Sequence, residues 1–127
     1  MELKEQVCSL ELAKELKELG VKQDAYWSWY ENGNSAELMH NPDGYRSMEG
    51  KTFDAFSVAE LGEMLPEEIE KDEQSYWLTI GVGFRHSWNV HYRKNGTSES
   101  WFNHEAETEA DARAKMLIYL LENKLIK

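Results

Sequence analysis

The sequence predicts an α+β fold, in which an antiparallel sheet of about five strands is packed by helices near both ends of the chain. Three observations lead to this prediction. Apolar residues recur at three- and four-residue spacing near both termini, they alternate with period two in between, and Asn-Gly pairs mark two hairpins. The expected order is helix, two strands, short helix, three strands, helix. The length of 127 residues fits one domain over 1–127.

The first helix is expected over residues 10–19. Ser9 suits its N-cap position, because a serine oxygen accepts hydrogen bonds from the backbone amides of the first turn. Gly20 suits its end, because glycine adopts the left-handed conformation at little steric cost. Val21 is then expected to fold back onto Leu16.

A hairpin is expected to follow this helix. Residues 26–30 are dense in strand formers, Asn32-Gly33 is a strong signal for a tight turn, and a return strand is expected over 35–40. A two-residue loop would pair Trp29 with Ala36. Both tryptophans of the first strand would then point toward the core.

The middle of the chain is expected to hold a short helix. Ser57 and Glu60 match the capping-box pattern at its start, and Pro66 must stop it about two turns later. The acidic run that follows, over 67–73, reads as a solvated loop or a frayed helical extension.

From Tyr76 onward the period of the apolar residues changes to two. Asn95-Gly96 is a second turn signal, and a two-residue loop there would pair Val90 with Trp101. Trp88 would share the core face with this pair. The expected strands cover residues 76–82, 87–94 and 97–104.

The last helix is expected to begin at Thr108, which forms an approximate capping box with Asp111. Its apolar residues recur at three- and four-residue spacing and make one stripe. We expect this stripe to face the strands, with the alanines close to the sheet and the leucines at the tryptophan layer. The stripe consists of Ala110, Ala114, Leu117, Leu121 and Leu125.

The 24 acidic residues outnumber the 14 basic ones, which gives a formal net charge of −10. This charge opposes the attraction to phosphate backbones and anionic lipids on which most nucleic-acid and membrane binders rely. The sequence has no apolar run near the ~20 residues of a membrane span, and we expect no signal peptide. Its single cysteine, Cys8, excludes an intrachain disulfide. We therefore expect a cytoplasmic protein that binds neither nucleic acid directly nor a membrane.

No metal site, cofactor or catalytic residue is expected. The histidines are His40, His86, His91 and His104. The pairing above puts His91 and His104 ~13 Å apart, since strands rise ~3.3 Å per residue, and a single ion cannot bridge that distance. Cys8 precedes a helix and has no cysteine-enzyme signature around it, which is typical of a packing residue. An enzyme is therefore the less favoured class.

The aromatic content is the sharpest functional signal, because 5 tryptophans, 6 tyrosines and 4 phenylalanines exceed the needs of a core of this size. One group of side chains is expected on the sheet face opposite the tryptophans. An exposed aromatic patch is a common recognition surface, and the acidic charge favours a protein as the partner. The alternative is that another helix covers this face. The candidate partner-binding residues are Tyr26, Tyr30, His91, Arg93 and Phe102.

Three segments, taken in order, resemble a group of small uncharacterised proteins encoded in bacteriophages and integrated prophages. They are residues 9–23 (SLELAKELKELGVKQ), 55–66 (AFSVAELGEMLP) and 108–126 (TEADARAKMLIYLLENKLI). Each is a capped helix, and the group has no assigned activity, so no functional residues carry over. The resemblance implies the cytoplasm of a bacterial host and a role accessory to phage or prophage biology.

The sequence thus favours a non-enzymatic protein-interaction or accessory module of phage type. One alternative is an acidic inhibitor that mimics nucleic acid and occupies the site of a DNA-binding protein, which would need carboxylates spaced along one face. Another is a small enzyme without a recognisable motif, which would need a deep pocket with converging polar groups. The sequence specifies neither the identity of the partner nor the oligomeric state.

Overall fold

The structure is a computed structural model that describes residues 2–41, 52–83, 86–94, 96–97 and 99–126. Residues 42–44 of one predicted turn and Asn95 of another lie outside them. The described helices and antiparallel strands confirm the predicted α+β class. Within these residues the strands form two sheets, of three and four strands, where the sequence predicted a single sheet. The elements are α1 (Leu3–Gln6), α2 (Leu10–Glu18), β1 (Trp27–Asn32), β2 (Ser35–His40), β3 (Thr52–Asp54), α3 (Val58–Met64), β4 (Glu68–Lys71), β5 (Gln74–Val82), β6 (Trp88–Lys94), β7 (Ser100–Ala106) and α4 (Glu109–Glu122).

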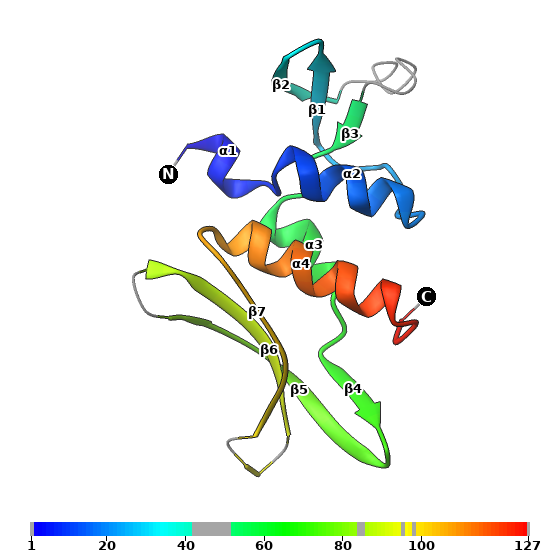
Figure 1. The fold of residues 1–127 in the computed structure, drawn as a ribbon, viewed down its shortest axis with the longest axis vertical. Coiled ribbons are helices and arrows are strands. Elements are labelled where there is room, and N and C mark those ends of the chain that lie inside the picture. Colours follow the sequence, from blue (N-terminus) through cyan, green and yellow to red (C-terminus); the bar gives the residue numbers. More distant parts are fainter. Residues whose placement is uncertain (1, 42–51, 84–85, 95, 98, 127) are drawn as a thin grey trace.

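Helix α4 occupies the centre of the molecule (Figure 1). The four-stranded sheet, ordered β4-β5-β6-β7, packs against it through β6 and β7, while α2 and α3 contact its other sides. The three-stranded sheet, ordered β2-β1-β3, lies beyond α2, which contacts β3. Buried side chains of α2, α3, α4 and β6 belong to one hydrophobic cluster. The two sheets are therefore joined through helices rather than by strand pairing.

The two ends of α2 lie where the sequence predicted them. Ser9 occupies the N-cap position, but within the described residues its side chain makes no capping hydrogen bond. Its backbone N–H instead donates to Asp111 Oδ1 of α4 at 2.7 Å. At the other end Gly20 has a φ of 88°, and the N–H of Val21 donates to the Leu16 carbonyl at 3.1 Å. Glycine thus ends the helix in a left-handed conformation that it adopts at little steric cost.

The first hairpin has the expected strands, but its register is two residues away from the prediction. Trp29 pairs with Leu38, not with Ala36. The loop is Gly33-Asn34, and glycine has a φ of 64° there, which suits the first position of a type II′ turn. A two-residue shift leaves each side chain on its expected face. Trp29 packs against the core cluster, while the other tryptophan of β1 packs against His40.

A buried carboxylate holds the three-stranded sheet to the chain that precedes it. Asp54 of β3 is 2% exposed and accepts hydrogen bonds from the Ala25 N–H at 2.7 Å and from Ser28 Oγ at 2.8 Å. Its own N–H donates to Gln23 Oε1 at 2.9 Å. Asn41 Nδ2 donates to the Ala25 carbonyl at 3.0 Å. These bonds satisfy polar groups that would be costly to leave unpaired in the interior.

Helix α3 begins and ends as predicted. Ser57 Oγ accepts from the Glu60 N–H at 3.2 Å, and Glu60 Oε1 accepts from the Ser57 N–H at 2.9 Å, which completes the capping box. Phe56 and Leu61 on either side of this cap are both buried. The helix ends shortly before Pro66, whose ring cannot continue it.

The prediction of a loop or frayed helix over the acidic run 67–73 is wrong. Residues Glu68–Lys71 form β4, in which Ile69 is 6% exposed and the acids on either side of it are exposed. The strand turns into β5 at Asp72-Glu73, whose φ values of 52° and 66° are those of a type I′ turn. One buried isoleucine is enough to fix which face of a short edge strand points inward.

The register between β6 and β7 departs from the prediction at a bulge. Val90 pairs with His104, and Trp101 pairs with Tyr92 rather than with Val90. Phe102 has a φ of 56° at this irregularity, an uncommon conformation for a bulky side chain. The extra residue brings Phe102 and His104 to one tyrosine ring of α4, with ring centroids 4.3 and 5.1 Å away. The expectation that Phe102 lies opposite the tryptophans is therefore wrong.

Helix α4 begins at its predicted cap, because Thr108 Oγ1 accepts from the Asp111 N–H at 3.1 Å. The prediction of one stripe that faces the strands is too simple. Leu117 and Leu121 face the ends of α2 and α3 across a shallow groove instead of the tryptophan layer. Burial extends around the helix because the sheet, α2 and α3 enclose it. The buried residues are Ala110, Ala112, Ala114, Met116, Leu117, Ile118 and Leu120.

Candidate functional site

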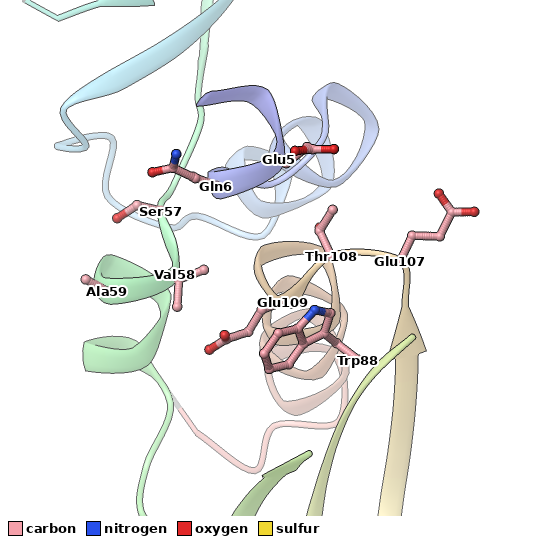
Figure 2. Close-up of a pocket in the computed structure, with 9 residues that line it drawn as sticks. All are labelled: Glu5, Gln6, Ser57, Val58, Ala59, Trp88, Glu107, Thr108 and Glu109. Atoms are coloured by element: carbon pink, nitrogen blue, oxygen red, sulfur yellow. The ribbon is translucent and has the colours of Figure 1, made fainter. Parts of the chain in front are cut away.

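A groove of about 590 Å³ opens where the ends of three helices meet the start of β6. In Figure 2 the side chains of Val58 from α3, Glu109 from α4 and Trp88 from β6 point into the space between α3 and α4. Glu107 lies at the rim, with its carboxylate directed away from α3. The full lining is Glu5, Gln6, Ser57, Val58, Ala59, Trp88, Glu107, Thr108 and Glu109.

Trp88 supplies the aromatic surface of the groove. It begins β6 and pairs with Val82 of β5 and Ala106 of β7, which places it on the predicted core face. The ring packs against the core cluster but is only half-buried. An indole held in this way offers a large apolar surface to a ligand without losing much side-chain freedom on binding.

Every charged residue that lines the groove is acidic. Glu5 and Glu107 are exposed. Glu109 is 22% exposed and forms an ion pair with Arg113 Nη2 at 2.6 Å, and Arg113 Nε donates to the same Oε2 atom at 2.8 Å. The other carboxylate oxygen of Glu109 has no hydrogen-bond partner among the described residues. The groove thus keeps a net negative charge after the Arg113 pair is counted.

The end of the Arg113 side chain lies close to Gly62 in α3. A Cβ atom at position 62 would lie 2.9 Å from Arg113 Nη1, closer than such atoms approach in folded proteins. A side chain at position 62 would thus require the end of Arg113 to move, whereas with glycine the Arg113 side chain is 16% exposed. The Arg113–Glu109 pair joins residues one turn apart on α4.

The two hydroxyl groups of the groove are engaged as helix caps. Ser57 Oγ accepts from the first turn of α3, and Thr108 Oγ1 accepts from the first turn of α4. Both hydroxyl oxygens thus already accept a backbone hydrogen bond, and no histidine is among the lining residues.

The structure separates the predicted partner-binding residues. His91 and Arg93 lie two residues apart on the same face of β6, opposite the face that α4 covers. Tyr30 lies within β1 of the other sheet, and Tyr26, which is 71% exposed, immediately precedes that strand. Phe102 packs against α4. These five residues do not form one surface.

His91 is held by its neighbour on the same strand. Its Nδ1 atom lies 2.8 Å from Asn89 Oδ1, and its buried Nε2 atom has no hydrogen-bond partner among the described residues. Burial lowers the pKa of His91, and the positive charge of Arg93 lowers that pKa further. The ring is therefore neutral near pH 7, with its Nδ1 side turned toward the asparagine.

Cys8 lies in the core and is not poised for nucleophilic chemistry. It is fully buried, its N–H donates to the Phe56 carbonyl at 2.9 Å, and its carbonyl accepts from Trp29 Nε1 at 2.8 Å. Burial raises the pKa of the Cys8 thiol to about 12, so the thiolate is not populated near neutral pH. Among the described residues no three His, Cys, Asp or Glu side chains gather closely enough to hold a metal ion.

Comparison with known proteins gives no match, whether to a protein-family model, a curated protein or a solved structure. Over the described part of the chain, none of the helices has the length and apolar character needed to cross a membrane.

Sequence reasoning identified Trp88 as a core residue but missed the groove beside it. The missed lining residues include Glu5, Val58, Glu107 and Glu109. Two capped helix starts, at Ser57 and Thr108, were recognised in the sequence, and acids cluster around the second of them. That the two starts lie side by side depends on tertiary packing, which local patterns do not encode.

Proposed function

We propose that this chain is a non-enzymatic protein-interaction module and that its acidic groove receives an arginine or lysine side chain from a partner protein. One observation carries the proposal: the charged lining residues are all carboxylates, and an accessible tryptophan ring lines the same groove. A basic side chain combines a positive head with an apolar stem, and it therefore complements both features.

The physical basis is a cation–π contact supported by charge. A guanidinium or ammonium group over a tryptophan face gains roughly 0.5 to 2 kcal/mol, and tryptophan is the best of the aromatic side chains for this contact. Glu109 can then pair with the cation from the side, while Glu5 and Glu107 lie at the rim. The net charge of −10 also raises the local concentration of basic segments.

The N-termini of α3 and α4 lie at the same groove, and helix N-termini favour anions. Two features offset this preference. Cap hydroxyls already accept from both first turns, and Glu109 and Asp111 place negative charge in the first turn of α4. An anionic ligand would also meet the carboxylates of the lining. The balance therefore favours a cation.

The proposal is tested by titrating the ¹⁵N-labelled chain with three capped peptides that differ at one position. That position holds arginine, neutral citrulline of the same shape, or phosphoserine. We expect the arginine peptide to shift the indole N–H signal of Trp88 and to bind about tenfold more tightly than the citrulline peptide. Equal affinity of these two peptides, or preference for phosphoserine, would overturn the proposal.

Matched variants locate the binding. Glu107→Gln removes an exposed rim charge and is expected to lower the affinity for the arginine peptide. Glu99→Gln is the control, because it removes the same charge at the far end of the β6–β7 hairpin. Trp88→Phe keeps an apolar ring in the core but weakens the cation–π contact. If Glu99→Gln lowers the affinity as much as Glu107→Gln, the attraction is a property of the whole surface rather than of the groove.

We also infer a phage or prophage setting for this module, supported by the resemblance of its three capped-helix segments to phage-encoded proteins. The setting is compatible with small accessory proteins that act by binding. The test is to measure the messenger RNA for this chain in the bacterium that encodes it, because prophage induction should raise its level. A message that stays constant through induction would count against this setting.

A further inference from the structure

The outer face of the four-stranded sheet carries an ordered row of an acid, an aromatic ring and a base. Glu68 of β4 pairs with Trp77 of β5, and Trp77 pairs with Arg93 of β6. All three side chains are exposed, and Trp77 retains 44% of its accessible surface. Figure 1 shows α4 on the opposite face of this sheet and no described helix on this one.

The acid and the base of this row do not form an ion pair with each other within one chain. Adjacent strands are ~4.8 Å apart, so the backbones of Glu68 and Arg93 are ~10 Å apart, with the tryptophan between them. Neither residue forms an ion pair with another described residue. Each copy of the chain thus presents one unpaired charge of each sign on either side of a large apolar ring.

We propose that this face binds a second copy of the chain around a two-fold axis that runs along β5. Such an axis turns the two faces toward each other and exchanges left and right, so Glu68 of each copy meets Arg93 of the other. Trp77 meets its own symmetry mate on the axis. The row is therefore self-complementary, which is what an isologous dimer interface requires.

The face is small for the interface of a stable dimer. Four strands of about seven residues cover roughly 440 Å² per copy, or about 900 Å² in total, which is below the ~1,200 Å² of standard stable interfaces. The net charge of −10 on each copy adds a repulsion. The expected product is a weak dimer whose population rises with protein concentration.

Sedimentation equilibrium of the intact chain up to about 1 mM tests the dimer, and charge swaps test its geometry. E68R alone and R93E alone each bring like charges together twice per dimer and should weaken association at least about tenfold. An equimolar mixture of these two variants should associate again, because every contact then joins opposite charges. The doubly substituted E68R/R93E chain should also dimerise.

The control for E68R is E99R, which makes the same change in net charge on an exposed residue outside this row. It should leave the dimer close to that of the native chain, and circular dichroism should show that every variant is folded. Three results would overturn the inference: a native chain that stays monomeric at the highest concentration, a mixture that associates no better than its separate components, or a dimer that survives both single swaps.

Discussion

The two sheets of this molecule are stabilised in different ways. The three-stranded sheet has a short third strand, and the buried Asp54 joins this strand to the chain before β1 through hydrogen bonds to Ala25 and Ser28. The four-stranded sheet instead packs Val90 and Tyr92, both fully buried, into the apolar core beside α4. The first sheet thus has hydrogen bonds to one buried carboxylate among its tertiary contacts, whereas the second buries more apolar area.

This difference determines how each sheet should respond to the loss of a polar group. An ionised acceptor that satisfies several buried donors leaves all of them unpaired when it is removed, and each unpaired group costs about 1 to 3 kcal/mol. A hydroxyl at the tip of a buried ring leaves only one partner behind, and the ring keeps its apolar contacts. The same kind of substitution should therefore be severe in one sheet and mild in the other.

Replacing Asp54 with alanine should have the largest effect. The Ala25 N–H and the Ser28 hydroxyl would lose their acceptor in a buried site, and we expect the free energy of unfolding to fall by about 3 to 5 kcal/mol. Urea denaturation measures the total. Hydrogen exchange should show faster opening of β1 and β3 than of β6, and a loss spread evenly over both sheets would contradict the comparison.

Replacing Tyr92 with phenylalanine should have a smaller effect. Its hydroxyl donates to the Pro66 carbonyl at 2.8 Å, and burial raises the pKa of this phenol. Removing the hydroxyl costs one hydrogen bond, so we expect a loss of about 1 kcal/mol in the free energy of unfolding by urea denaturation. A loss as large as that of the Asp54 variant would show that the four-stranded sheet also depends on polar contacts.

The smallest effect should appear as a dependence on pH. Burial lowers the pKa of His104, and the charge of Lys115 lowers that pKa further. Below about pH 6.5 His104 therefore takes up a proton in the unfolded chain but stays neutral in the folded chain. Its contribution to stability is present above that pH and is lost as the pH falls.

His104→Gln should accordingly make the fall of the free energy of unfolding between pH 7 and pH 5.5 shallower. We expect a difference under about 1 kcal/mol, because the site is partly screened by solvent. Urea denaturation at several pH values measures the slope. Part of the slope should remain in the variant, since the pKa of His91 is lowered as well. Identical slopes for variant and native chain would show that His104 titrates alike in both states.

Local chemistry made the helix ends predictable. The capping box of Ser57 and Glu60 and the left-handed Gly20 depend on residues within one or two turns, and the structure confirms both. The strand pairings were harder. The register of the first hairpin differs from the prediction by two residues because glycine takes the first loop position. The register between β6 and β7 differs because Phe102 adopts a positive φ, which is not expected of a phenylalanine.

The acidic composition of residues 67–73 led to a wrong prediction, because the burial of one apolar residue decides the structure of this segment. In β4 the acids suggested a solvated loop, whereas the burial of Ile69 makes the segment a strand. The groove was unpredictable for a different reason, since Glu5, Trp88 and Glu109 come from three separate elements. Only the packing around α4 brings them together.

The thiol of Cys8 can report how often the core of the folded chain opens. Thiol reagents attack the thiolate, and this thiol is both covered and held protonated near neutral pH. Alkylation must therefore wait until the core around Cys8 opens, and its rate measures how often the core opens. Because the chain has 1 cysteine, the signal comes from one place. The rate of this local opening can thus be measured on the unchanged sequence, without an engineered label.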